Sequence, residues 1–125
     1  MDVTPLIPQG RQIIERYGNG GFRVTGESYR GSILVLPDRT AAWPLTAIGQ
    51  LDLASLEPVL AAEPPVEVLL VGCGSAMALI DPDLRDAARA RGVALEPMDT
   101  GAACRTYNVL MAEDRRVAAA LIAVD

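Results

Sequence analysis

The spacing of hydrophobic residues along the chain changes near residue 43. Before that point, short runs of β-branched and aromatic residues lie between glycine-rich turns, a pattern typical of strands. Strands are expected over residues 12–17, 22–25, 28–31 and 32–36. Gly26 separates the second strand from the third, which predicts a hairpin with a positive φ at the glycine. The last strand is apolar on both faces and is therefore expected in the interior of a sheet.

After this point, segments with helical spacing alternate with segments with strand spacing. Helices are expected over residues 53–62, 83–91 and 101–112, and strands over residues 66–71, 93–98 and 117–124. Pro58 lies within the first helix, which predicts either a kink or a helix that starts only near Ser55. Asp81 is expected to cap the second helix, and either Asp99 or Thr100 the third.

The order strand, helix, strand over residues 66–98 indicates where a ligand would bind. A unit of this kind with short loops folds as a right-handed crossover, which makes the strands 66–71 and 93–98 parallel neighbours. The loops that follow these two strands then lie at the same edge of the sheet. Ligands of open α/β sheets bind at this edge, beyond the carboxyl ends of the strands.

Length and composition indicate one α/β domain. The chain has 125 residues, of which 50% are hydrophobic, and this is enough for one ordinary core. We therefore expect a single domain over residues 1–125, with a β-rich N-terminal part and helices packed on a sheet.

Net charge and hydropathy argue against two classes of partner. The formal net charge is −5, so neither a field of cations for nucleic acid nor a basic face for a membrane surface is expected. No apolar run reaches the roughly 18 residues of a membrane span. The first residues lack the charged-then-apolar pattern of a signal peptide. These features predict a cytoplasmic protein.

The chain lacks the side chains of the common catalytic and metal sites. It has no histidine and two cysteines without CxxC spacing, so no catalytic residue, metal or cofactor is predicted. Gly72 and Gly74 resemble the start of a dinucleotide-binding fingerprint, but Met77 stands where the third glycine belongs. The next helix begins only after Pro82, too late to place its N-terminus at a pyrophosphate. Nicotinamide and flavin binding are therefore not expected.

Two segments converge at the predicted ligand-binding edge. The glycine-rich loop follows the strand 66–71, and the helix 101–112 begins beside it. A helix N-terminus attracts anions because its first N–H groups are unpaired. The candidate ligand-binding residues are Gly72, Gly74, Ser75, Thr100, Arg105, Thr106 and Asn108. The alternative is structural: the glycines permit a turn, Thr100 caps the helix, and Arg105 pairs with a carboxylate.

Cys73 and Cys104 lie on the same two segments and form a candidate redox pair. A thiol near a helix N-terminus has a lowered pKa and more thiolate character. Cysteine is also among the most buried residue types, so inert packing in the core is the alternative.

Two further groups of residues have both a structural and a functional interpretation. Residues 105–108 are polar or amphipathic and face successive directions of one helix, so some of them must bond to neighbouring elements. They form either a buried polar network or the lining of a pocket. The aromatic residues of the first half either pack in the core or form a platform for a partner: Tyr17, Phe22, Tyr29 and Trp43. An apolar edge or a patch around Trp43 would also suit a symmetric homodimer.

Several stretches resemble one known family. The most specific is residues 96–110, Glu-Pro-Met-Asp-Thr-Gly-Ala-Ala-Cys-Arg-Thr-Tyr-Asn-Val-Leu, and residues 116–122 continue the match. Further matching positions are Tyr17, Gly18, residues 22–24, Gly31, Ser32, Trp43, Gly72 and Gly74. In these positions the chain resembles the Mth-type domain family, which includes the adipogenesis-associated Mth domain proteins and the mitochondrial complex I assembly factor three.

The resemblance implies a three-layer α/β fold with a mixed central sheet, in which the last strand runs antiparallel to its neighbours. It also implies an assembly or regulatory role, because the eukaryotic relatives are known as such factors. The first hypothesis is therefore a non-enzymatic protein-interaction or assembly-factor-like domain with a protein partner. The second is binding of a small anionic metabolite, or slow chemistry on it, at the loop 72–75 and the start of the helix 101–112. The third is a thiol redox switch.

Overall fold

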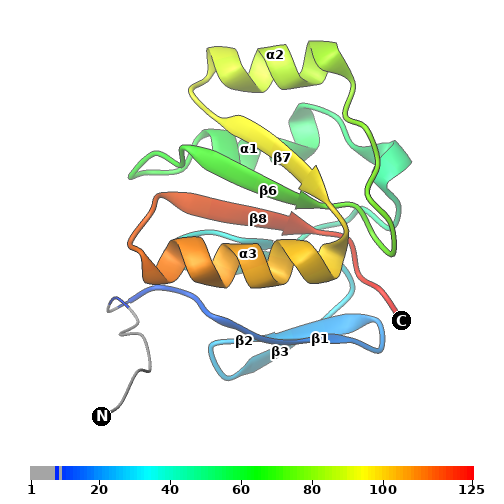
Figure 1. The fold of residues 1–125 in the computed structure, drawn as a ribbon, viewed down its shortest axis with the longest axis vertical. Helices are drawn as coiled ribbons and strands as arrows, with labels where there is room; N and C mark the ends of the chain where they lie inside the picture. The colour runs from blue at the N-terminus through cyan, green and yellow to red at the C-terminus, as the bar shows by residue number, and fades with distance from the viewer. Residues whose placement is uncertain (1–7, 9) are drawn as a thin grey trace.

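The computed structural model describes residue 8 and residues 10–125, with a five-stranded sheet at its centre (Figure 1). The strands lie in the order β5-β4-β8-β6-β7. Their bounds are Thr40–Ala42 for β5, Ile33–Val35 for β4, Val117–Leu121 for β8, Val68–Gly72 for β6 and Ala94–Met98 for β7. β6 runs parallel to β7 and β8, whereas β4 runs antiparallel to β5 and β8. The sheet is therefore mixed, as the resemblance implies.

The direction of β8 corrects one expectation. The last strand was expected to run antiparallel to its neighbours, but β8 is antiparallel only to β4 and parallel to β6. The reason is the helix α3, Thr100–Ala112, which carries the chain back from the carboxyl end of β7. β8 consequently starts at the same end of the sheet as β6. The predicted parallel pairing of β6 with β7 is confirmed.

A separate antiparallel sheet contains β1 (Ile14–Gly18), β2 (Gly21–Val24) and β3 (Glu27–Arg30) in that order. Thr25 and Gly26 link β2 to β3, and both have a positive φ, 46° and 81° respectively. Two consecutive positive φ values are typical of the tight hairpin turn whose twist matches that of its strands. The predicted hairpin is confirmed, and Thr25 joins Gly26 in the left-handed region.

The two longer helices begin where their capping residues predict. α2 spans Pro82–Ala90, and the Asp81 side chain accepts a hydrogen bond from an amide of its first turn. The side chain of Asp99 does the same for α3. Of the two predicted caps of α3, Asp99 therefore acts as the cap and Thr100 is the first helical residue.

The helix expected over residues 53–62 is shorter than predicted. Two 3-10 turns, Ile48–Gln50 and Ala54–Leu56, precede the short helix α1, Glu57–Leu60. Pro58 lies in the first turn of α1, where a missing N–H breaks no helical hydrogen bond. The proline therefore starts the helix and does not kink it.

Two hydrophobic clusters lie on the two faces of the five-stranded sheet. Leu69 and Val71 of β6 belong to the α2-side cluster and Leu70 to the α3-side cluster, because successive strand side chains point to opposite faces. α1 and α2 cover the first face, while α3 and the three-stranded sheet cover the second (Figure 1). The three-layer arrangement is confirmed. Among the described residues, no helix has both the length and the apolar character needed to cross a membrane.

Candidate functional site

The glycine-rich loop and the start of α3 are in direct contact at the carboxyl end of β6. A Cβ atom at Gly72 would lie 3.0 Å from the Cα of Thr100, so only glycine allows this approach. The Thr100 hydroxyl donates to the Ile122 carbonyl oxygen (2.7 Å) and accepts from the Gly74 amide (3.0 Å). Its side chain is fully buried. With the Asp99 side chain already capping α3, the chain's own groups occupy this corner.

Gly74 and Ser75 instead line an open groove at the same edge of the sheet. The groove has a volume of about 470 Å³. Its other walls are Thr46, Ala47, Ile48, Cys73, Ile122, Ala123, Val124 and Asp125. The groove thus combines the loop after β6 with the segment after β8.

The residues that follow Ser75 expose large apolar side chains. Met77 is 55% exposed and Leu79 is 89% exposed, whereas Ile80 returns to the core. We call residues 75–79 the apolar loop. This exposed loop was not predicted, although an apolar run with neither helical nor strand spacing directly after a strand was a usable signal. A group of exposed apolar residues next to a groove is typical of a contact surface.

Polar residues of α3 bond to β1 and its approach segment. The Tyr107 hydroxyl donates to the Gln12 carbonyl oxygen (2.8 Å). The Asn108 amide accepts from the Ile14 N–H (3.0 Å) and donates to the Ile14 carbonyl oxygen (2.7 Å). Thr106 is half-buried. The prediction that some of these side chains bond to neighbouring elements is confirmed, and the partner is the three-stranded sheet.

Arg105 lies at a second hollow, between β1 and α3. Its guanidinium donates to the Tyr17 hydroxyl (3.1 Å) and is exposed to solvent. The hollow has a volume of about 410 Å³. It is lined by Ile14, Glu15, Arg16, Tyr17, Cys104, Arg105 and Asn108.

The structure therefore divides the candidate ligand-binding residues between two places. Gly74 and Ser75 line the groove at the carboxyl edge, and Arg105 and Asn108 line the hollow beside β1. The buried Thr100 lines neither of them. A small-anion site that spans both segments stays a prediction.

The two thiols lie on opposite faces of the five-stranded sheet. Cys73 belongs to the α2-side cluster and Cys104 to the α3-side cluster, and both are buried. Burial raises the pKa of the Cys104 thiol from 9.0 to about 12, and the nearby Arg105 charge offsets this only in part. The structure does not bring the two sulfurs together, so a switch that joins them stays a prediction.

The aromatic residues of the first half divide between the core and the surface. Trp43 and Phe22 are each 4% exposed, and the Trp43 indole N–H donates to the Ser55 carbonyl oxygen (2.9 Å). Core packing is therefore confirmed for these two. Trp43 does not form an exposed patch, and a symmetric homodimer stays a prediction. Tyr29 is half-buried, and Tyr17 is 40% exposed.

In the described part of the chain, no three carboxylate or thiol side chains gather in a group that could hold a metal ion. The protein has concave surfaces for binding. One is the groove at the carboxyl edge of the five-stranded sheet, and another is the hollow between β1 and α3.

Comparison with known proteins gives one family and several relatives. The model of the family described as "Protein of unknown function (DUF498/DUF598)" matches residues 14–122. The NADH dehydrogenase [ubiquinone] 1 alpha subcomplex assembly factor 3 of Xenopus tropicalis is 37% identical over 109 residues, which cover 87% of this chain and 60% of that protein. An uncharacterized protein of Rhodobacter capsulatus is 43% identical over 109 residues, 87% of this chain and 82% of that protein. The chain thus spans about three-fifths of the assembly factor's length.

Solved structures agree with the fold. An outer membrane protein from Bartonella henselae superimposes with a TM-score of 0.85 at 40% identity, over 93% of this chain and 98% of that chain. A Mth938-like domain from Bordetella pertussis superimposes with a TM-score of 0.81 at 30% identity, over 98% of this chain and 92% of that chain.

Proposed function

We propose, from the premise that this chain belongs to the DUF498/DUF598 family, that it is a non-enzymatic protein-interaction domain that holds a protein partner during assembly of a larger complex. Relatives that carry the name of a NADH dehydrogenase assembly factor support this function. The proposed partner is a protein, and the proposed location is the cytoplasm.

The apolar loop is the observation that carries the proposal. Met77 and Leu79 keep more than half of their surface in water, whereas most of the large apolar residues of the five-stranded sheet are buried. Exposed apolar surface is stabilised when a partner removes it from water, at about 25 cal/mol per Å². The groove beside Ser75 supplies a concave surface next to these side chains. We assign the partner's contact to this loop and groove.

The chemistry of the polar groups supports binding over catalysis. The chain has no histidine, and the raised pKa keeps the Cys104 thiol protonated at neutral pH. The Thr100 side chain is fully buried, and its hydroxyl already makes two hydrogen bonds within the protein. None of these groups is arranged as an activated nucleophile with a base.

Native mass spectrometry of protein purified gently from its own host tests the proposal. The wild-type chain is expected to carry a protein partner at stoichiometric ratio, and the double variant Met77→Ser/Leu79→Ser to lose it. Val109→Ser is the matched control, because Val109 is also 60% exposed but lies on α3 away from the apolar loop. Identification of the partner by peptide sequencing shows whether it belongs to NADH dehydrogenase.

Two results would contradict the proposal. If wild-type protein carries no partner under varied purification conditions, the proposal of a protein partner is wrong. If the loop variant and Val109→Ser lose the partner equally, the assignment of the contact to the apolar loop is wrong.

A second candidate function is binding of a small anionic metabolite at the hollow beside β1. The exposed guanidinium of Arg105 next to this hollow favours it. A screen of carboxylate and phosphate metabolites by thermal shift is expected to give a ligand whose affinity falls in Arg105→Ala. Equal affinity in both proteins counts against the site.

A further inference from the structure

The outward face of the three-stranded sheet holds a regular arrangement of arginines and glycines. Residues that pair directly across antiparallel strands point to the same side of a sheet, and so do residues two apart along a strand. The pairing therefore places six positions on this face in two rows, one of Arg16, Arg23 and Ser28 and one of Gly18, Gly21 and Arg30. We call this surface the arginine face.

The three arginines of this face are close neighbours. Arg16 lies directly opposite Arg23, a pairing that puts Cβ atoms about 5 Å apart. Arg30 lies opposite Gly21 and is diagonal to Arg23, at about 7–8 Å between Cα atoms. Arginine side chains are long enough for all three guanidinium groups to reach one ligand segment. Like charges directly opposite each other destabilise a sheet, so this pairing works against the fold of the isolated domain.

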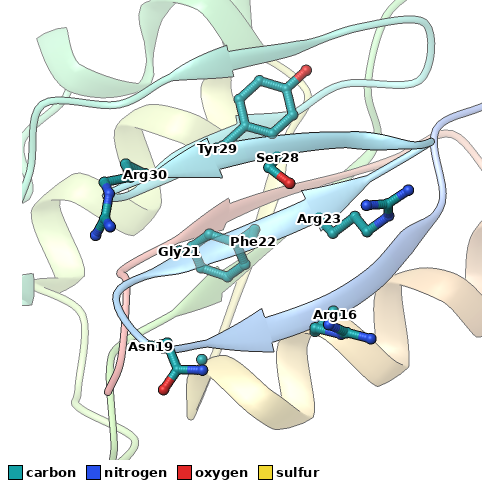
Figure 2. A pocket seen from close by; sticks show the side chains of 9 residues that line it. Arg16, Asn19, Gly21, Phe22, Arg23, Ser28, Tyr29 and Arg30 are labelled. Atoms are coloured by element: carbon teal, nitrogen blue, oxygen red, sulfur yellow. The ribbon is translucent and has the colours of Figure 1, made fainter.

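The two glycines leave a hollow between the arginines. The hollow has a volume of about 310 Å³, and Figure 2 shows Arg16 and Arg23 on one side of Gly21 and Arg30 on the other. A Cβ atom at Gly21 would collide with the backbone carbonyl oxygen of Tyr29. The floor of the hollow is therefore kept free of a side chain by the geometry of the hairpin itself.

Little negative charge from the protein faces these arginines. Glu15 lies 3.5 Å from Nε of Arg23, and the same carboxylate oxygen also accepts the Gly26 N–H. Arg16 and Arg30 take part in no ion pair with any residue in the described range. A chain with net charge −5 thus presents a local positive surface whose guanidinium donors are available to a ligand.

We propose that the arginine face binds an extended acidic segment of a partner protein, with carboxylates at alternate positions. This inference rests on the proposed function in assigning a protein partner, but it uses a different surface. The hollow is open to solvent, and a small molecule there would keep much of its surface in water. Net charge −5 repels a long polyanion such as nucleic acid.

The edge of the sheet fits the same occupant. β3 is the outer strand, since β2 is its one strand partner in the part of the chain that the structure describes. An extended segment that pairs with this edge places every second side chain on the arginine face, next to Ser28 and Arg30. Carboxylates at those positions accept paired hydrogen bonds from the guanidinium groups, which is the geometry that arginine favours.

A titration followed by NMR amide shifts tests the inference. The probe is the peptide Gly-Glu-Thr-Glu-Val-Glu-Gly at low ionic strength, and its control is the same peptide with glutamine at each glutamate. The glutamate peptide is expected to shift the amides of Gly18, Gly21 and Arg30, and the glutamine peptide is not. The variant Arg16→Gln/Arg30→Gln is expected to raise the Kd about tenfold, because it removes two charge-assisted contacts.

The control variant is Arg85→Gln/Arg89→Gln on α2, which changes the net charge equally and is expected to keep the wild-type Kd. Equal weakening in both variants would show attraction by net charge only and would overturn the inference. Binding of inorganic phosphate at these amides without binding of the glutamate peptide would overturn it in favour of a small-anion site. The absence of any shift would overturn it outright.

The two proposals fail separately. If the peptide does not bind while Met77→Ser/Leu79→Ser still loses its partner, only the arginine face is wrong. If the peptide binds while the loop variant keeps its partner, only the assignment of the apolar loop is wrong.

Discussion

The Thr100 hydroxyl joins three segments of the chain: the loop after β6, the start of α3 and the end of β8. Thr100→Val keeps the shape of the side chain and removes both hydrogen bonds, leaving the Gly74 amide without its acceptor. The free energy of unfolding is expected to fall by about 1–3 kcal/mol. Chemical denaturation measures this. Thr106→Val, a matched change at a half-buried position of the same helix, is expected to have a smaller effect.

The Cys104 thiol gives the fold a dependence on alkaline pH. Its pKa is raised by burial to about 12 from 9.0, so the folded state holds this proton more tightly than the unfolded state. Its contribution to stability is therefore complete below pH 9 and is lost as the pH rises toward 12. The difference in free energy of unfolding between wild type and Cys104→Ala is expected to shrink over this range in denaturation curves. A constant difference would contradict it.

At this scale the sequence predicted residue types better than residue roles. Thr100 and Asp99 were both recognised at the start of α3, but which one caps depends on the backbone of the β6 loop. Thr100 bonds to that loop, and Asp99 is left to cap. Cys73 and Cys104 follow neighbouring strands, yet the alternation along β6 sends one thiol to the opposite face from the other.

Among the elements, β1 depends on one side chain of α3. Asn108 forms a hydrogen bond with each of the two backbone groups of Ile14, in the way a neighbouring strand would. Asn108→Ala is expected to speed hydrogen exchange of the β1 amides and to lower the free energy of unfolding by about 1–3 kcal/mol.

Hydrogen-exchange mass spectrometry measures the local effect of Asn108→Ala. Val109→Ala, at the neighbouring exposed position, is the control and is expected to leave β1 exchange unchanged. Uniform acceleration across the whole chain, with no excess at β1, would show that Asn108 does not hold this strand in particular.

The elements that the sequence predicted well carry strong local signals. β6 and β7 are apolar runs, and α2 has both a capping Asp81 and a proline at its start. The helix expected over residues 53–62 begins later than its periodicity predicts, because Pro58 lies in the first turn of α1 and residues 54–56 form a separate 3-10 turn. The direction of β8 depends on where α3 returns the chain, and no local pattern contains that information.

In the whole molecule, the apolar loop is expected to contribute to binding and not to stability. Met77 and Leu79 make few contacts with the core because most of their surface is in solvent. Met77→Ser/Leu79→Ser is therefore expected to change the free energy of unfolding by less than about 0.5 kcal/mol per substitution. Chemical denaturation checks this. A larger loss would mean that the loop packs against the fold and that its variant is not a clean test of partner binding.

The arrangement of layers lay beyond prediction from the residues alone. The three-stranded sheet packs on α3 through pairs such as Asn108 with Ile14, which are separated by 94 positions in the chain. The groove and the hollow beside β1 both arise from such distant contacts, so the candidate residues could be identified by type but not assigned to one cavity. The three-layer arrangement was predicted from the resemblance to a family and not from the local sequence patterns.

The position of β8 affects how the protein is made. The ribosome synthesises this strand after all the others, yet it lies between β4 and β6, inside the sheet. Until residues 117–121 emerge from the exit tunnel, the two halves of the sheet have no strand to join them and their apolar faces stay in water. The sheet of the nascent chain is therefore complete only after residues 117–121 have emerged, and until then the earlier strands expose apolar surface that chaperones recognise.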